Sequence, residues 1–355
     1  MKKKRVILGL SGGVDSSVAA YLLREQGYEV ICVFMKNWHE NDFTLEDECP
    51  WIDDSREALI AANHLDLPYY SVDFSEEYKK QVVDYMFSEY QAGRTPNPDV
   101  MCNQKIKFDV FMNKMMSQFD ADYIATGHYA RTRIVDGEVR LLKAIDPSKD
   151  QSYFLCRLNQ DQLSKAIFPL GGMLKSEVRE LAHEIGLNTA ARKDSQGLCF
   201  VGHINLPDFL SQAITKKEGD VKLIGTDRIV GRHIGVNFYT IGQRKGLQLK
   251  YPNRVFIVKK DIENNVIWVA EENDPSRYTS KIKMSNIMTF RSVEKDLELT
   301  AQIRYHGEFL SGKLNGSMFE LDKPTKDPIA SGQFIVIYKE DEIVSSGIIE
   351  ASQSI

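Results

Sequence analysis

A short glycine-rich segment near the start of the chain constrains the fold more than any other feature. The segment SGGVDS, residues 11–16, follows the apolar run Arg5–Leu10 and precedes apolar residues at helical spacing that end at Gly27. The apolar run predicts a buried strand, and Gly27 is typical of the position just beyond a helix. A strand, a glycine-rich turn and a helix N-terminus present backbone N–H groups to an anion. The segment therefore predicts a phosphate site, with a plain strand–turn–helix as the alternative.

The same six residues exclude the two commonest phosphate motifs. No lysine follows at the position that GxxxxGK[ST] requires, and the paired glycines are followed by Val14, so GxGxxG is absent. The serines offer hydroxyl groups, and Asp15 can hold Mg²⁺ or cap the helix. The segment resembles the PP-loop of the ATP pyrophosphatases, which split ATP into AMP and pyrophosphate. That resemblance implies activation of a substrate oxygen by adenylation.

The first two hundred residues alternate strand-like and helix-like segments. Glu29–Lys36, Tyr69–Phe74 and Ala121–Ala130 are expected to be strands, with helices between them. Strands separated by helices predict a parallel, doubly wound α/β sheet, in which ligands bind beyond the carboxyl ends of the strands. The residues expected around that crevice are Ser11–Ser16, Met35, Gly127 and His128.

The chain changes character after about Gly202. Short β-like runs punctuated by Gly, Asn and Asp continue to the C-terminus and predict small sheets or a barrel. At 355 residues the chain is also too long for one ordinary core. We therefore predict an adenine nucleotide hydrolase-like α/β domain over residues 1–205, a β-rich domain over 206–280 and a barrel-like domain over 281–355.

Composition and charge limit the class of protein. No apolar run approaches the roughly 18 residues of a membrane-spanning helix, and the N-terminal MKKKRVILGL lacks the apolar core of a signal peptide. A cytoplasmic location without a membrane partner is expected. The formal net charge of −5 argues against a protein that coats nucleic acid non-specifically, but it leaves room for a local basic surface.

One cysteine lies in a segment shaped by prolines. The chain has five cysteines and no CxxC pair, which argues against a disulfide framework or a zinc site. Cys102 lies in GRTPNPDVMCNQKIKF, after Asp99 and before two lysines. If Asn103 begins a helix, Cys102 lies at its N-terminus, where the helix dipole and the lysines favour a reactive thiolate. Asp99 is then a candidate general acid or base, and Asn97 a candidate hydrogen-bonding residue.

A second cysteine lies in a comparable segment. Cys199 belongs to AARKDSQGLCFVGH, which is polar, flanked by glycines and preceded by an Arg-Lys pair. A buried structural role is the alternative for an isolated cysteine, and it fits Cys32 and Cys156, which lie in apolar runs. Cys49 lies among carboxylates, which disfavour a thiolate. Cys102 and Cys199 are therefore the candidate catalytic thiols.

Seven segments together identify a family. They are GLSGGVDSSVAA, GRTPNPDVMCNQKIKF, ATGHYAR, KDQSYFL, KDSQGLCFVG, YTIGQRKGL and SGQFIVIY. With them the chain resembles the bacterial tRNA-specific 2-thiouridylase family over essentially its whole length. The family replaces the C2 oxygen of the wobble uridine of certain tRNAs with sulfur. The resemblance implies use of ATP and Mg²⁺, tRNA substrates (those for Lys, Glu and Gln), and a sulfur-donor protein, either a relay carrier or a cysteine desulfurase.

The resemblance also assigns roles to matching positions. Cys199 would carry a persulfide, Cys102 would be the nucleophile that closes a disulfide with Cys199, and Asp99 would be the general acid/base. The positions expected to hold ATP are Gly9, Leu10, Ser11, Gly12, Gly13, Val14, Asp15, Ser16, Met35 and Gly127. Those expected to contact tRNA are Asn97, Pro98 and Asp99 around the target base, with His128, Lys149, Asp150, Gln151, Arg304, Tyr305 and Gln333.

One position departs from the family pattern. The usual Ala-Pro-Gly-Gln reads Ala330-Ser331-Gly332-Gln333 in this chain. Loss of the proline is expected to loosen the turn slightly, which affects only the fine positioning of Gln333.

A basic segment is the candidate for further tRNA contacts. Gly219–Lys260 carries nine lysines and arginines against two aspartates, which is a net charge of +7. Aromatic residues are interleaved, and such a mixture suits phosphate binding and base stacking. The alternative is a solvated β face over core aromatics. Arg244 and Lys245, in the IGQRKGL turn, are the expected phosphate contacts.

Two other functions remain as alternatives. A PP-loop amidotransferase-type ligase would activate a carbonyl for ammonia, and it needs no pair of reactive thiols. A non-catalytic RNA-binding protein would bind tRNA without consuming ATP. Serine at positions 102 and 199 distinguishes the first from a thiolating enzyme, because an amidating enzyme should survive the replacement.

Overall fold

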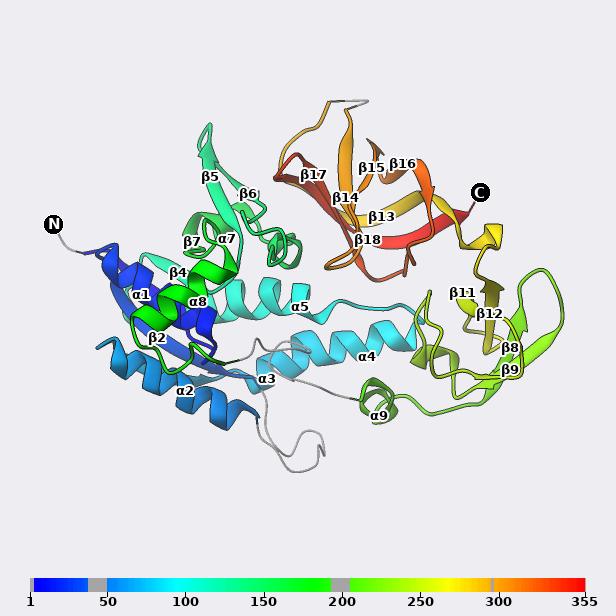
Figure 1. The fold of residues 1–355 in the computed structure, drawn as a ribbon, viewed down its shortest axis with the longest axis horizontal. Helices are drawn as coiled ribbons and strands as arrows, with labels where there is room; N and C mark the ends of the chain where they lie inside the picture. Colours follow the sequence, from blue (N-terminus) through cyan, green and yellow to red (C-terminus); the bar gives the residue numbers. More distant parts are fainter. Residues whose placement is uncertain (1–2, 38–49, 193–204, 295–296, 355) are drawn as a thin grey trace. The chain divides into compact units, whose positions relative to one another are not determined.

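The computed structural model describes residues 3–37, 50–192, 205–294 and 297–354 (Figure 1). The chain divides into two compact units. The first comprises Met1–Val83, Pro98–Ile204 and Asp341–Ile343, and the second comprises Asp84–Asn97, Asn205–Glu340 and Val344–Ile355. The boundaries at 205 and 280 stay a prediction. Within the described ranges, no helix is long and apolar enough to cross a membrane.

The first unit is built on a five-stranded parallel sheet with the order β3-β2-β1-β4-β7. The chain winds from β1 outward to β3, then returns to place β4 on the other side of β1. The predicted doubly wound α/β fold is therefore confirmed, and its switch point lies between β1 and β4. The strands are β1 (Arg5–Gly9), β2 (Glu29–Lys36), β3 (Tyr69–Asp73), β4 (Tyr123–Thr126) and β7 (Ala166–Ile167).

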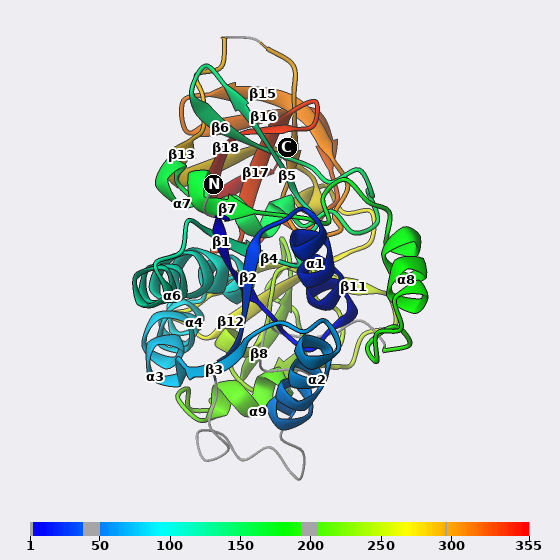
Figure 2. The same cartoon turned by 90° about the vertical axis from the view of Figure 1, so that its left-hand side faces the viewer.

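Helices cover both faces of this sheet (Figure 2). Because side chains alternate along a strand, Val6 and Leu8 point to one face, where they share a core with α1, α2 and α8. On the opposite face the Tyr70 ring packs 4.8 Å from the Phe119 ring, at the end of α6. The helices of this unit are α1 (Val14–Glu25), α2 (Pro50–His64), α3 (Ser75–Tyr78), η2 (Lys79–Val83), α5 (Pro98–Met101), η3 (Cys102–Phe111), α6 (Met112–Phe119), η4 (Ser152–Leu155), α7 (Gln160–Lys165) and α8 (Lys175–Glu184).

Two features of this unit differ from the sequence expectations. An unpredicted antiparallel hairpin, β5 (Arg131–Val135) and β6 (Glu138–Leu142), lies in the chain between the sheet strands β4 and β7. The prediction that Asn103 begins a helix is wrong, because α5, η3 and α6 form one helical run that starts at Pro98. Proline suits the first helical position, since its fixed φ matches the helix and no N–H is needed there.

The second unit contains a five-stranded sheet and a closed six-stranded antiparallel barrel. The sheet has the order β10-β9-β8-β12-β11, and the barrel runs β13-β16-β15-β14-β17-β18 and closes by pairing β13 with β18. Apolar residues such as Ile282, Ala301 and Ile337 fill the barrel. The β-rich second half with a barrel at its end is therefore confirmed.

The remaining bounds belong to this unit. Its helices are α4 (Asp84–Gln91), α9 (Leu206–Ser211), η5 (Val236–Phe238) and η6 (Pro275–Arg277). The sheet strands are β8 (Gly219–Leu223), β9 (Ile229–His233), β10 (Gln248–Leu249), β11 (Val255–Asp261) and β12 (Val266–Glu271). The barrel strands are β13 (Thr279–Thr289), β14 (Leu299–Gln302), β15 (Leu310–Asn315), β16 (Met318–Thr325), β17 (Phe334–Lys339) and β18 (Glu342–Ser354).

Candidate active site

The glycine-rich loop connects β1 to α1, and its serine hydroxyl groups form hydrogen bonds within the loop. The backbone N–H of Ser11 donates to Ser16 Oγ at 3.1 Å, and Ser16 Oγ lies 3.2 Å from the Gly13 carbonyl. Helix α1 begins with Gly13 as its N-cap and has no side-chain cap, so neither Asp15 nor Ser16 caps it. Backbone N–H groups of the first turn are thereby left for an anion, as the predicted phosphate site requires.

Gly127 lets the end of β4 approach this loop closely. A Cβ on Gly127, just after β4, would lie 2.8 Å from the Ser16 nitrogen and 3.0 Å from the Asp15 carbonyl carbon. A Cβ on Gly9 would lie 3.4 Å from Met35 Cε. Of the positions predicted to line the nucleotide pocket, Gly127 therefore lies against the start of α1, and Met35 lies beside Gly9.

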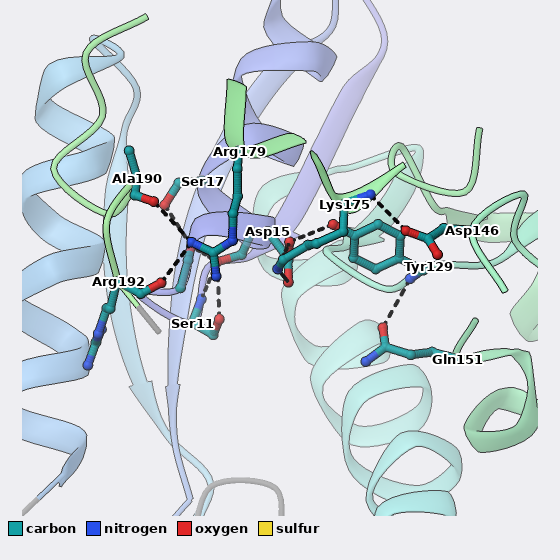
Figure 3. A network of polar contacts seen from close by, with 12 residues as sticks. Ser11, Asp15, Ser17, Tyr129, Asp146, Gln151, Lys175, Arg179, Ala190 and Arg192 are labelled. Atoms are coloured by element: carbon teal, nitrogen blue, oxygen red, sulfur yellow. Dashed lines mark hydrogen bonds and ion pairs between the residues drawn. The ribbon is translucent and has the colours of Figure 1, made fainter. Parts of the chain in front are cut away.

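Asp15 is held by a cation from a distant helix (Figure 3). Lys175 Nζ lies 2.7 and 2.8 Å from the two Asp15 carboxylate oxygens, and the Tyr129 hydroxyl donates to Asp15 Oδ1 at 2.7 Å. The Lys175 backbone N–H in turn donates to Asp146 Oδ2 at 2.8 Å. The Lys175 side chain is only 10% exposed, whereas that of Asp15 is 31% exposed, so the lysine is shielded from water better than the carboxylate is.

Sequence reasoning missed Lys175 and Tyr129, although one signal for Lys175 was present. Lys175 is the first residue of α8, where the helix dipole disfavours a cation. A lysine at that position is therefore explained better by a partner elsewhere than by the helix itself. Tyr129 gave no comparable signal.

Arg192 ties the segment that precedes Cys199 to the glycine-rich loop. Its guanidinium donates to the Gly12 carbonyl at 2.7 Å and to Asp54 Oδ1 at 2.5 Å. Burial raises the pKa of Asp54, and the charge of Arg192 opposes that shift. Arg179 donates to the carbonyls of Ala190 and Arg192, both at 3.1 Å, and so fixes the backbone from residue 190 to residue 192. Arg192 belongs to the Arg-Lys pair that precedes Cys199 in the sequence, and its charge is paired with that of Asp54.

One carboxylate of the loop, that of Asp15, could hold a magnesium ion. Among the described residues, no group of three or more His, Cys, Asp or Glu side chains could hold a metal ion. Mg²⁺ is commonly bound by one or two carboxylates together with substrate phosphates. Asp15 beside the loop hydroxyls supplies such a carboxylate.

The cysteines of the described ranges are all buried. Cys102 is fully buried in the first turns of the helical run that starts at Pro98, and half-buried Asp99 precedes it by three residues, on the same helix face. Cys32 and Cys156 are also fully buried, and burial raises the pKa of Cys32 to about 12. These two fit the predicted structural role. Cys199 and Cys49 lie outside the described residues.

The predicted tRNA contacts of the first unit are largely engaged within it. His128 is buried, with Nδ1 2.7 Å from Thr126 Oγ1; burial, and then the charge of Lys107, hold its pKa well below the ordinary value. Gln151 exchanges hydrogen bonds with the Tyr129 backbone at 2.8 and 3.0 Å. The remaining two are Lys149, which is half-buried, and Asp150, whose carboxylate accepts from the Ala144 and Ser152 N–H groups.

In the second unit, Gln333 fixes the segment that carries Asn97. Its Nε2 donates to the carbonyls of Thr95 and Pro96 at 3.0 and 2.9 Å, and its Oε1 accepts from Asn97 Nδ2 at 3.3 Å. The Thr95 N–H also donates to the Ser331 carbonyl at 2.7 Å. Gln333 and Asn97, both predicted from the sequence, are therefore brought together.

The other predicted contacts of the second unit lie on its surface. Arg304 is exposed and pairs with Asp327 at 3.2 Å, while the half-buried Tyr305 ring lies against that of His306. Arg244 and Lys245 are both exposed in the turn after η5. Of the interleaved aromatics, Phe238 and Tyr239 are buried and Tyr251 is half-buried, so the first two belong to the core rather than to a stacking surface.

Family models match nearly the whole chain. Residues 4–203 match a tRNA methyl transferase HUP domain, residues 207–271 a tRNA methyl transferase PRC-barrel domain, and residues 264–349 an aminomethyltransferase beta-barrel domain.

Curated relatives match over the full length. A tRNA-specific 2-thiouridylase MnmA of Flavobacterium johnsoniae is 44% identical over 98% of this chain and 100% of its own. One of Christiangramia forsetii is 45% identical over 98% and 100%, and one of Bacillus licheniformis is 43% identical over 98% and 95%. A solved complex of a 4-thiouridine synthetase with RNA and ATP is 20% identical over 59% of this chain and 50% of that one, with a TM-score of 0.35, a similarity too low to bear on function.

Proposed function

The chain belongs to the tRNA-specific 2-thiouridylase family, and we propose that Cys102 and Cys199 are the pair of thiols with which it acts. It is a tRNA sulfurtransferase that uses ATP to install 2-thiouridine. The observation that carries this conclusion is 43–45% identity to such enzymes over 98% of the chain. The assignment of steps to residues is our proposal.

Activation of the uridine takes place at the glycine-rich loop. The C2 carbonyl of uridine resembles an amide, and its oxygen is a poor leaving group until the α-phosphate of ATP is transferred to it. The uncapped start of α1 binds the pyrophosphate that is released, as a helix N-terminus does for anions. Mg²⁺ would be held by Asp15 and would neutralise phosphate charge. Lys175, beside Asp15, supplies a second positive charge at the same place.

Sulfur transfer needs two thiols, because one delivers the sulfur atom and the other releases it. The terminal sulfur of a Cys199 persulfide attacks C2, and AMP leaves with the original oxygen. The Cys102 thiolate then attacks the Cys199 sulfur, which breaks the S–S bond and leaves the terminal sulfur on C2. The two protein thiols become a disulfide, which an external reductant must reduce before the next cycle. That requirement favours a reducing compartment, and we infer a cytoplasmic location.

The contacts of Arg192 support Cys199 as a partner of this site. Arg192 is bonded to the Gly12 carbonyl of the loop, and Cys199 follows it by seven residues. An extended chain of seven residues spans at most about 25 Å, and this reach is compatible with a role of Cys199 at the loop. Cys102 is fully buried, so its reaction with Cys199 requires local opening of the first turns of its helix.

The target base is recognised beside the start of that same helix. Asn97, Pro98 and Asp99 surround the base, and Asp99 exchanges the proton that accompanies activation. The wobble base must leave the anticodon stack to reach them, as in other base-modifying enzymes. Gln333 positions this segment through its bonds to Thr95 and Pro96.

The rest of the tRNA contacts basic and polar surface residues, chiefly Arg244, Lys245, Arg304 and Tyr305 in the second unit. His128, Lys149, Asp150 and Gln151 form the contact of the first unit. We infer that the substrates are the tRNAs for Lys, Glu and Gln, and that the persulfide on Cys199 comes from a relay carrier or a cysteine desulfurase.

Mass spectrometry of both protein and tRNA tests this proposal. After incubation with unmodified tRNA, ATP, Mg²⁺ and a persulfide source, we expect an oxygen-to-sulfur exchange on one uridine and an extra sulfur on Cys199. Cys102→Ser and Cys199→Ser should each abolish thiolation, whereas Cys156→Ala serves as the matched control. Thiolation that survives both serine variants would refute the two-thiol assignment. AMP release without thiolation, supported by ammonia, would favour an amidating ligase.

A further inference from the structure

Asn37 is a buried polar side chain that no described residue satisfies. It follows the last residue of β2, and it is 2% exposed. Among the described residues, neither its Oδ1 nor its Nδ2 atom has a hydrogen-bond partner. A buried amide without a partner costs free energy, so folded proteins rarely retain one without a use for it.

The position of Asn37 in the sheet places it at the nucleotide crevice. β2 lies beside β1, and the hydrogen bond from the Phe74 N–H to the Lys36 carbonyl, 2.7 Å, continues the strand pairing to its last residue. Asn37 is therefore at the carboxyl edge of the sheet, where ligands bind in doubly wound folds. It is next to the strand from which the glycine-rich loop starts.

Strand alternation fixes the face on which Asn37 lies. Met35 points to the face of η3, because a Cβ on Gly9 would lie 3.4 Å from Met35 Cε and 3.9 Å from a ring carbon of Phe111. Residues two apart on a strand share a face, and they are separated by about 7 Å. A purine that contacts Met35 would therefore be within reach of the Asn37 amide. Because both side chains are buried in the nucleotide-free protein, binding requires a local opening there, as reaction at Cys102 does.

We propose that Asn37 recognises the adenine base of ATP by donating from Nδ2 and accepting at Oδ1. A carboxamide pairs in this way with the 6-amino group of adenine and a neighbouring ring nitrogen. This inference rests on the proposed ATP reaction. Adenine is favoured over the target uracil, because Met35 belongs to the nucleotide pocket, whereas the target base is assigned to residues 97–99.

The unpartnered state of Asn37 makes it effective in binding. Its amide has already lost its water during folding, so bonds to the base are gained without a second loss of hydration. Removal of the amide should therefore weaken nucleotide binding without lowering the stability of the nucleotide-free protein. This combination separates a recognition role from a structural one.

The test compares ATP with purine riboside triphosphate, which lacks the 6-amino group. Dissociation constants are measured by calorimetry in the absence of tRNA, for the whole chain. The wild type should bind ATP about tenfold more tightly than the analogue, which is one neutral hydrogen bond. Asn37→Leu should bind ATP at least tenfold more weakly than the wild type does, and it should bind the two nucleotides equally within a factor of two.

Gln162 provides the matched control, because it is a buried amide with its partners in place. Its Nε2 donates to the Phe108 carbonyl at 2.9 Å, and its Oε1 accepts from the Asn159 N–H at 3.0 Å. Gln162→Leu should lower the thermal midpoint and keep the preference for ATP. Asn37→Leu should leave the midpoint of the nucleotide-free protein unchanged or raise it. If the Asn37→Leu variant does not fold, the same measurements are made on Asn37→Ala.

Three results would overturn the assignment. One is retention of the tenfold preference for ATP in the Asn37 variants. Another is a loss of stability equal to that of Gln162→Leu, which would mean that a buried water already satisfies the amide. The third is unchanged ATP binding with a raised KM for tRNA, which would assign Asn37 to the target base. A wild type that binds neither nucleotide would instead refute the ATP reaction itself.

Discussion

Replacement of Gly127 by alanine tests how closely β4 approaches the glycine-rich loop. The added Cβ would lie 2.8 Å from the Ser16 nitrogen and 3.0 Å from the Asp15 carbonyl carbon, and both are backbone atoms. Atoms of neighbouring side chains could rotate away, but the backbone at the start of α1 must shift. Since Gly127 is not among the glycines with positive φ, strain at its own backbone contributes nothing.

The size of the effect follows from the same geometry. Overpacking of this kind costs roughly 1–3 kcal/mol, whereas a glycine-to-alanine change at a permissive φ gains about 0.4–1 kcal/mol, so a net loss of about 1–2 kcal/mol is expected. The displaced first-turn N–H groups no longer match the phosphates, and we expect ATP to bind at least tenfold more weakly, about 1.4 kcal/mol.

Calorimetric titration with ATP and the thermal midpoint measure the two effects. Gly172→Ala is the matched control, because a Cβ there would have no atom within 4 Å and its φ is also not positive. The control should match the wild type in ATP affinity and be at least as stable. A Gly127→Ala protein with wild-type affinity and stability would refute the close approach of β4 to α1.

Three further changes have defined outcomes. Lys175→Met leaves the Asp15 carboxylate without its cation. Because Asp15 is 31% exposed, we expect the free energy of unfolding, measured with denaturant, to fall by only about 1–2 kcal/mol. We also expect ATP affinity to fall at least tenfold. Ser331→Pro should raise the thermal midpoint. The Gln333 N–H donates to the Ala330 carbonyl at 3.3 Å and Gly332 has φ +91°, as in a type II turn, in which proline fits the second position. An unchanged or lower midpoint would contradict this assignment of the turn. Burial lowers the pKa of Lys260 from 10.5 to about 8, so between these pH values the unfolded chain binds more protons than the folded chain does. The contribution of Lys260 to the free energy of unfolding therefore rises from pH 8 to 10.5. Lys260→Met should lack this rise when denaturant unfolding is measured across that range.

The elements that the sequence predicted are those with a local signal. The apolar runs Arg5–Leu10 and Glu29–Lys36 contain β1 and β2 of the predicted sheet, because a strand buried on both faces is apolar except at its ends. The glycine-rich loop was recognisable because its glycines, serines and aspartate are contiguous. The β-rich second half could be predicted because turn residues recur at short intervals.

For contacts between distant segments, no local signal identified which residue the partner would be. Asp15 and Lys175 are 160 residues apart, and Thr95 and Gln333 are 238 apart. Each is a single polar residue without a periodic pattern, so only the fold brings it to its partner. The helix start at Pro98 was missed for a different reason: prolines occur both in stiff loops and at first helical positions, and the sequence TPNP fits either.

Asp15 has a partner in the nucleotide-free protein, whereas Asn37 has none among the described residues. The difference follows from the free energy that each side chain costs when it is buried without a partner. An ionised carboxylate that is partly buried loses far more free energy without a partner than a neutral amide does. Asp15 therefore has a cation in the nucleotide-free protein, supplied by Lys175, and a ligand must compete with or join that pair. Asn37 is neutral, so the fold can leave it without a hydrogen-bond partner among the described residues, and in our proposal both of its amide atoms bind the base. Charged groups of this site should accordingly exchange partners when a nucleotide binds, whereas Asn37 should only gain them.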